Sequence, residues 1–207
     1  MVITESESAR IAACVAAAEA RTSVELKLVL APVASRYGAF ALIYPALFAL
    51  LVGCGLALGW AGTSARAMVL LETVGFVFAY AVLQIPSLRV AIVPRAVKRK
   101  AAIRLARLQF ARLGLDTAAG RPAVLFFVAT AERYVEILVD ARVAARVPQE
   151  RFDAMIAQFT TLAAEGRVVD AFGGVCAAIG DALAEPFPPQ AGDRNERSDQ
   201  IDVIEPL

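Results

Sequence analysis

The order of apolar and polar residues gives the chain two long hydrophobic segments flanked by shorter amphipathic ones. Residues 39–60 carry no charged side chain, and residues 67–86 carry a single one, Glu72. At 1.5 Å per residue, a helix over either segment matches the roughly 30 Å hydrocarbon core of a bilayer. Because only residues 61–66 separate the two segments, the pattern predicts an antiparallel hairpin of two membrane-spanning helices.

The basic residues around the hairpin indicate its orientation. The connecting loop contains only Arg66, whereas both outer flanks are basic, which places both chain ends in the cytoplasm. A hairpin buried inside a soluble protein is the alternative, but the rest of the chain is too short to cover two helices that are apolar all round. The flanking residues are Arg21, Lys27 and Arg36 before the hairpin and Arg89, Arg95, Lys98, Arg99, Lys100 and Arg104 after it.

Glu72 is the candidate functional residue of the hairpin, because a charge inside a span is costly and usually marks a function or a partner. Three roles are open at this point. The side chain can reach back to the loop and pair with Arg66, make an intramembrane polar contact with another subunit, or belong to a proton or ion pathway. Gly53, Gly55 and Gly59 give the first span small residues that permit close helix packing.

The segments on either side of the hairpin predict a small domain of helices and strands. Thr4 and Glu7 have the spacing of a capping box before a helix over residues 6–21. Residues 24–30 alternate apolar and charged positions, which is typical of a half-buried strand. This strand leads directly into the first span.

After the hairpin, the pattern predicts a basic helix, a pair of strands and two further helices. The strands are joined by a tight turn and should form an antiparallel pair. Pro148 occupies the first turn of the next helix, and three prolines after Glu185 end the last one. The predicted elements are a helix over 94–113 with the apolar stripe Ile103, Ala106, Phe110 and Leu113, strands over 123–130 and 134–139, and helices over 148–165 and 167–185.

The helix over residues 94–113 is expected to contact lipid headgroups. A basic residue near an anionic membrane surface contributes up to about 1 kcal/mol of binding. Nucleic acid is not an expected partner, since no aromatic platform or recognition motif accompanies the charges. The headgroup contacts are assigned to Arg95, Lys98, Arg99, Lys100 and Arg104.

Residues 190–207 are polar and predict an extended tail. Within this tail, Ile201, Val203 and Ile204 would allow it to add as an edge strand to a partner.

Composition supports the membrane interpretation and removes several kinds of chemistry. Hydrophobic residues make up 58% of the chain and the mean hydropathy is +0.61, more than a soluble globule normally carries. The chain has no histidine, which excludes Ser-His-Asp catalysis, Cys-His catalysis and His-ligated zinc. Cys14, Cys54 and Cys176 lack the spacing of a zinc site or a disulfide framework and are expected to be buried and inert.

The acidic residues near the strand pair are the remaining candidates for a metal site. Glu132, Glu136 and Asp140 share strand parity, but positions four apart along a strand lie about 13 Å from each other. Asp140 is therefore the one metal candidate, and a calcium ion there would need further oxygens from Glu150, Asp153 or backbone carbonyls. The simpler expectation is that Glu132, Arg133 and Glu136 form a solvated strand edge.

The order helix, strand, helix, strand pair, helix, helix resembles the TPM domain, a family named after thylakoid proteins of photosystem II repair and an acetylcholine-receptor auxiliary protein. The resemblance is carried by RIAACVAAAEARTSVELKLVL at residues 10–30 and RPAVLFFVATAERYVEILVDARVAARVPQERFDAMI at residues 121–156. The chain also looks like a group of bacterial membrane proteins in which a two-span hairpin follows the first strand. Those proteins end in a stretch similar to EPFPPQAGDRNE, which here occupies residues 185–196.

This resemblance implies a helix-flanked sheet and a role in the assembly or maintenance of membrane complexes. Some TPM members are described as acid phosphatases or calcium binders, a use that requires carboxylates near the strand pair. Many members have a glycine-rich turn after the second of these strands, where this chain has Asp140 and Ala141. No DxDx or CxxxxxR phosphatase motif is present.

These observations predict an α+β protein: a small helix-flanked β-sheet domain of the TPM kind, interrupted by a transmembrane hairpin in the bacterial inner membrane. The parts are residues 1–38 and 89–189 for the domain, 39–88 for the hairpin and 190–207 for the tail. The expected function is non-catalytic: an accessory or assembly subunit that contacts a larger membrane complex through its spans or tail, with no required cofactor. The alternative is a metal-dependent phosphatase-like hydrolase using calcium or magnesium, and a transport role through Glu72 would require oligomerisation.

Overall fold

The computed structural model of the 207-residue chain describes residues 4–59, 64–115, 121–189 and 200–204. It divides into two compact units: a sheet domain formed by Met1–Ala34 with Arg99–Leu207, and a helical hairpin unit formed by Ser35–Lys98. The described residues contain eight helices and a four-stranded mixed sheet. The predicted α+β class is therefore confirmed.

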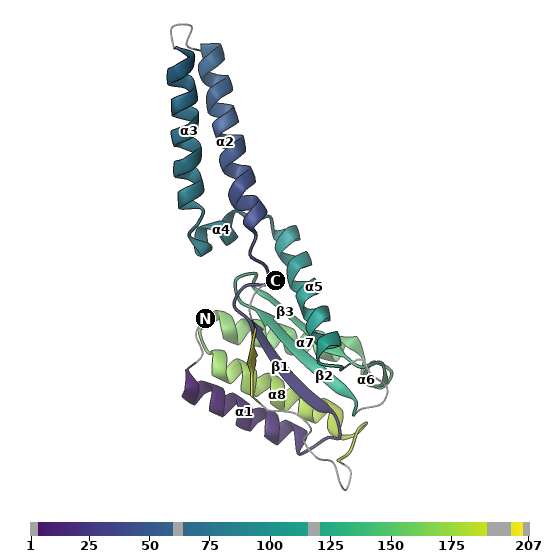
Figure 1. Cartoon of the computed structure of the whole chain (residues 1–207). Helices are drawn as coiled ribbons and strands as arrows, with labels where there is room; N and C mark the ends of the chain where they lie inside the picture. The colour runs from purple at the N-terminus through teal and green to yellow at the C-terminus, as the bar shows by residue number, and fades with distance from the viewer. Residues whose placement is uncertain (1–3, 60–63, 116–120, 190–199, 205–207) are drawn as a thin grey trace. The chain divides into compact units, whose positions relative to one another are not determined.

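The sheet joins segments that lie on opposite sides of the hairpin unit in the sequence (Figure 1). Its order is β3-β2-β1-β4. β1 is parallel to β2, with Glu25 opposite Ala123 and Ala31 opposite Ala129, whereas β2 and β3 are antiparallel. The strand before the hairpin and the two strands after it thus belong to one sheet. The strands are β1 (Glu25–Ala31), β2 (Ala123–Ala129), β3 (Tyr134–Val139) and β4 (Asp202–Val203).

The expectation that the first strand is half-buried is wrong. Every residue of β1 is buried, and Glu25 and Lys27 are only 5% and 4% exposed. The reason is that helices cover both faces of the sheet. The apolar and charged side chains that alternate along β1 therefore point to opposite faces, and both faces are buried. Lys27 Nζ lies 3.1 Å from Asp202 Oδ2 and donates to the Gln200 carbonyl.

The C-terminal strand belongs to the chain's own sheet. β4 pairs in parallel with β1, placing Asp202 opposite Val29 and Val203 opposite Leu30. Ile201 is buried in the core, whereas Val203 is 60% exposed. The structure therefore places these tail residues beside β1 of the same chain.

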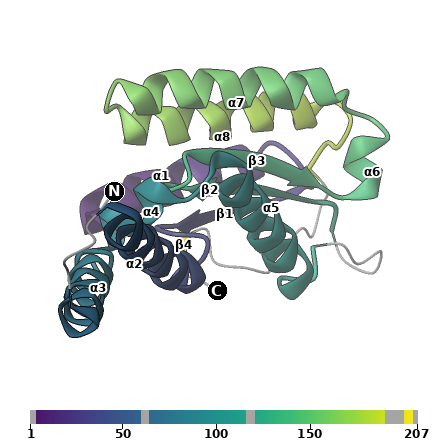
Figure 2. The ribbon, with the colours of Figure 1, turned by 90° about the horizontal axis from the view of Figure 1, so that it is seen from above.

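Three helices pack on one face of the sheet, as Figure 2 shows for α7 and α8. The core on this face contains a triangle of edge-to-face rings, Phe126, Phe159 and Phe172, with centroids 4.9–5.9 Å apart. α1 begins with the predicted capping box of Thr4 and Glu7. Pro148 is the N-cap of α7, one residue before the first turn in which it was expected. The helices are α1 (Glu5–Glu19), α7 (Gln149–Ala164) and α8 (Val168–Ala184).

One helix covers the other face of the sheet. α5 (Arg95–Arg112) buries Ala102, Leu105 and Ala106, which pack with Leu125 and Phe127 of β2. The predicted stripe is thus partly wrong: Ala106 is buried, but Ile103 is only half-buried. Phe110 and Leu113 of the predicted stripe are partly buried and pack against this core.

The hairpin unit contains α2 (Gly38–Gly59), α3 (Ala65–Val82) and α4 (Pro86–Ile92). The second apolar helix ends at Val82, before the predicted end at residue 86, because Pro86 starts the separate short helix α4. Arg89 of α4 donates to the Leu83 carbonyl at 3.0 Å and to the Arg36 carbonyl at 3.3 Å. This side chain therefore links the end of α3 to the segment that precedes α2.

Candidate functional site

The two apolar helices are the most extensive candidate interaction surface of the hairpin unit. Windows of 19 and 18 residues, Gly38–Leu56 and Ala65–Val82, are long and apolar enough to cross a membrane. Only 11% of the first window and none of the second is buried, and large side chains such as Leu51 and Phe78 are 71% and 70% exposed. The covered core hairpin of a soluble protein would bury these side chains.

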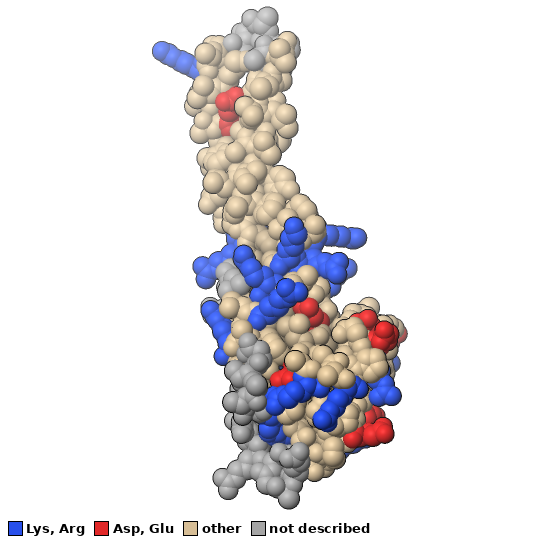
Figure 3. Space-filling model, turned by 90° about the vertical axis from the view of Figure 1, so that its right-hand side faces the viewer, with Lys and Arg blue, Asp and Glu red and all other residues tan. Residues whose placement is uncertain are grey.

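Glu72 is the one acid of this unit and faces the other helix. Its carboxylate fills the space beside Gly53 of α2, where a Cβ atom would overlap Glu72 Oε1. Gly53 is buried and Glu72 is half-buried. Among the residues that the structure describes, neither Arg66 nor any other side chain forms an ion pair or hydrogen bond with Glu72. The red carboxylate interrupts the tan surface of the hairpin in Figure 3.

The five predicted headgroup-contacting residues all lie on α5, but they are not equivalent. Arg95, Arg99, Lys100 and Arg104 are exposed. Lys98 is half-buried, and its Nζ donates to the Val90 carbonyl at 3.3 Å. Four of the five cations are thus open to an external anion.

Tyr134 and Glu136 form a polar pair on the edge strand β3, on the α5 side of the sheet. The Tyr134 hydroxyl and the Glu136 carboxylate lie close enough for each group to influence the pKa of the other. Burial raises the pKa of Tyr134 to about 12, helped by the neighbouring Glu136 charge. Burial also raises the pKa of Glu136, against the opposing effects of Tyr134, Arg107 and Arg99.

The expected solvated edge is wrong for two of its three members. Glu136 Oε2 is buried and accepts no hydrogen bond from the described residues. Glu132 Oε1 accepts a hydrogen bond from the Ala34 amide at 3.0 Å, so this side chain binds the segment that leaves β1. Arg133 alone is exposed, at a positive φ of 51° in the turn between β2 and β3.

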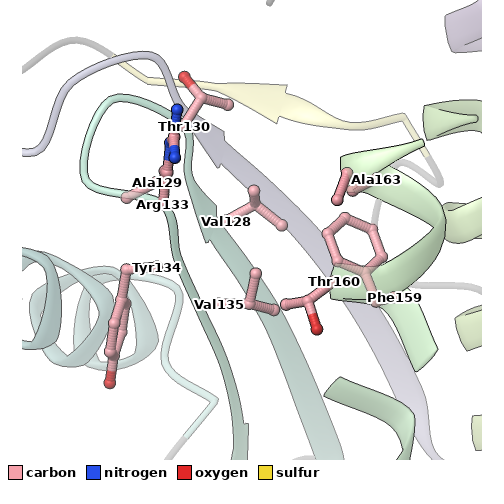
Figure 4. Close-up of a pocket in the computed structure, with 10 residues that line it drawn as sticks. Val128, Ala129, Thr130, Arg133, Tyr134, Val135, Phe159, Thr160 and Ala163 are labelled. Atoms are coloured by element: carbon pink, nitrogen blue, oxygen red, sulfur yellow. The ribbon is translucent and has the colours of Figure 1, made fainter. Parts of the chain in front are cut away.

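A pocket of about 630 Å³ lies between this turn and α7 (Figure 4). Val128, Val135, Phe159 and Ala163 provide apolar walls, and Thr160 adds a hydroxyl. The Tyr134 side chain points to the opposite side of the strand in Figure 4. Since the lining residues include no acid and no cysteine, this arrangement suits binding of an apolar group better than acid–base or nucleophilic chemistry.

No pattern in the sequence predicts this pocket. The pocket forms where Val128 of β2 and Val135 of β3 face α7. Because α7 begins 10 residues after β3 ends, only the packing of this helix on the sheet brings its side chains to the strands. Each lining residue by itself has the character of a core or turn residue.

Asp140, the metal candidate, acts as the N-cap of the short helix α6 (Ala141–Ala144). Its Oδ1 accepts a hydrogen bond from the Arg142 amide at 2.6 Å, and its Oδ2 accepts one from Arg142 Nη2 at 2.7 Å. The hydrogen bond from the Arg142 side chain is the main cause of a lowered Asp140 pKa. Asp153 accepts a hydrogen bond from Gln149, and the described residues contain no group of three or more potential metal ligands.

The three cysteines occupy different environments. Cys176 is buried, as expected, and burial raises its pKa to about 12. Cys14 is half-buried, and Cys54 lies exposed on α2. The expectation of burial is therefore wrong for Cys54, because the surface of α2 has no protein cover at that position.

The fold and these sites define the class of protein: an α+β sheet domain whose first two strands are separated in sequence by an exposed apolar hairpin. No protein-family model matches the chain, and no curated protein matches it. The chain is similar to the NMR structure of the BA42 protein from the psychrophilic bacterium Bizionia argentinensis, with a TM-score of 0.59 and 16% sequence identity. The match covers 98% of this chain and 96% of that one. At this identity the similarity concerns the fold alone.

Proposed function

We propose that the chain is a non-catalytic, membrane-anchored interaction protein, an accessory or assembly subunit of a larger complex in a bacterial inner membrane. One observation carries the proposal: a complete sheet domain forms across an insertion of two exposed apolar helices. Such an insertion ties a domain to the bilayer at two points of its chain.

The charge distribution supports a cytoplasmic location for both termini. The segments before α2 and after α3 carry most of the basic residues near the hairpin, whereas the loop between the spans carries Arg66 alone. Arg95, Arg99, Lys100 and Arg104 are exposed and free to meet anionic headgroups.

We further propose that the sheet domain belongs to the TPM family. Support comes from the observed order of elements, in which a helix and a strand precede the hairpin and a helix, two paired strands and two long helices follow it. This membership would favour assembly or maintenance of membrane complexes over catalysis. The rival metal-dependent hydrolase gains no support from Asp140, whose carboxylate is already bound by Arg142.

The test is purification of the tagged full-length protein from membranes in mild detergent, followed by mass spectrometry. A membrane protein recovered in constant stoichiometry supports the proposal. The matched control carries Leu51→Arg on α2, whose side chain is 71% exposed; it should lose membrane retention, because an arginine within a span is costly. A solitary protein that hydrolyses phosphomonoesters with added calcium or magnesium would overturn the proposal in favour of the hydrolase.

A further inference from the structure

The contact between Glu72 of α3 and Gly53 of α2 determines the position of the Glu72 carboxylate on the hairpin. Glu72 lies seven residues after Ala65, the first residue of α3, or roughly 10 Å along the helix axis. Instead of extending along α3 toward the loop, the side chain lies across α2 at Gly53. The carboxylate is half-buried between the two helices and reaches the surface of the unit (Figure 3).

At this position the half-buried Glu72 side chain has no hydrogen-bonding or ion-pair partner among the described residues of the hairpin. Buried charges in proteins are paired or hydrogen-bonded, and in a bilayer the surrounding hydrocarbon supplies no substitute. Glu72 has neither an ion pair nor a hydrogen bond among the residues that the structure describes. An external donor at the same depth would satisfy it.

We infer that Glu72, held on Gly53, is the docking point for a membrane-spanning helix of another protein that carries a lysine or arginine at this depth. The inference rests on the proposed membrane insertion and names the contact through which the proposed subunit meets its partner. A second copy of this chain does not fit. Residues 39–60 and 67–86 contain no lysine or arginine, so a second copy would bring another carboxylate in place of a cation.

Gly53 is part of the site because it provides the space for the carboxylate. Any side chain at position 53 overlaps Glu72 Oε1 and forces it to move. Gly55, two residues further along the same helix, has open space where its Cβ would be. Gly53→Ala and Gly55→Ala therefore form a matched pair that differs in the proposed contact.

The experiment uses the full-length protein, labelled with a donor dye at its N-terminus and reconstituted in phosphatidylcholine vesicles. The probe is an acceptor-labelled leucine-rich helical peptide of about 20 residues, with a single lysine roughly 10 Å from one end. An all-leucine peptide serves as the reference, and energy transfer measures association. Alkaline carbonate extraction first establishes insertion of each variant.

The wild-type protein and Gly55→Ala should bind the lysine peptide about tenfold more tightly than the leucine peptide, in the range of measured interhelical polar contacts. Glu72→Gln and Gly53→Ala should lose most of this preference while remaining inserted. Equal binding of both peptides to the inserted wild-type protein, or self-association that Glu72→Gln leaves unchanged, would overturn the inference alone. Release of the wild-type protein by carbonate would instead overturn the proposed membrane function on which it depends.

Discussion

The sheet domain buries its large apolar side chains and pairs a buried charge, whereas the hairpin unit exposes large apolar side chains and leaves its acid unpaired among the described residues. In the domain, Lys27 is 4% exposed and pairs with Asp202, and Phe126 is completely buried. In the hairpin, Phe78 is 70% exposed, and Glu72 has no partner among the described residues. The two patterns agree with water around the domain and hydrocarbon around the proposed membrane hairpin. Water favours burial of apolar side chains, whereas hydrocarbon accepts exposed apolar side chains and disfavours exposed charges.

The acids make the same comparison more specific. Glu132 Oε1 and Asp140 Oδ1 accept hydrogen bonds from the Ala34 and Arg142 amides, so these two oxygens of the domain have partners within the domain. Glu72 is left for an external group.

The largest effect is expected from the same substitution made in each unit. Phe126→Ala removes a fully buried ring from the Phe126, Phe159 and Phe172 triangle and should cost about 3–5 kcal/mol of domain stability. Phe78→Ala removes a ring that is 70% exposed and should change domain unfolding by less than about 0.5 kcal/mol. Pulse proteolysis across a urea series in mild detergent measures both. Equal losses would show that the two units do not differ as described.

A smaller loss is expected when the buried cation of β1 is removed. Lys27→Ala removes the ion pair with Asp202 and the hydrogen bond from Lys27 Nζ to the Gln200 carbonyl. Because the Asp202 side chain is 42% exposed, water can solvate it in part, and the cost should be about 1–3 kcal/mol. Lys100→Ala on α5 is the control, since Lys100 is exposed and its loss should leave thermal unfolding nearly unchanged. A Lys27→Ala protein as stable as the control would contradict a structural role for the pair.

Asp140→Ala tests whether this residue caps a helix or binds a metal. Loss of the N-cap of α6 should cost about 1 kcal/mol, with or without calcium in a thermal-shift assay. The lowered pKa of Asp140 means that its stabilising contribution is present above its ordinary pKa of 3.8 and is lost as the pH falls through the folded-state value. Asp153→Ala, at an exposed position of α7, should behave like the wild type. Calcium-dependent stabilisation of the wild type that Asp140→Ala abolishes would favour the metal site.

The sequence was most informative where one pattern determines one element. The capping box of Thr4 and Glu7, the strand pair and the two apolar helices follow from local spacing, and all appear in the structure. The burial of Glu25 and Lys27 was not predictable in this way, because it depends on α5 and β4, which come much later in the chain. The same reason applies to the sites: the Glu72–Gly53 contact and the Val128–Phe159 pocket exist only once separate elements pack together.

The smallest expected effect concerns Glu136, an acid of the domain with a buried oxygen that accepts no hydrogen bond from the described residues. Burial raises its pKa, so the folded domain favours the protonated form and should lose stability as the pH rises from the ordinary value of 4.5 through the folded-state value. Glu136→Gln removes this titration and keeps a polar side chain of similar size beside Tyr134. Thermal unfolding of both proteins is measured between pH 4 and 7. The stability of the variant relative to the wild type should increase as the pH rises through this range. A constant difference would mean that Glu136 titrates as it does in the unfolded chain, and its buried Oε2 would then need another explanation.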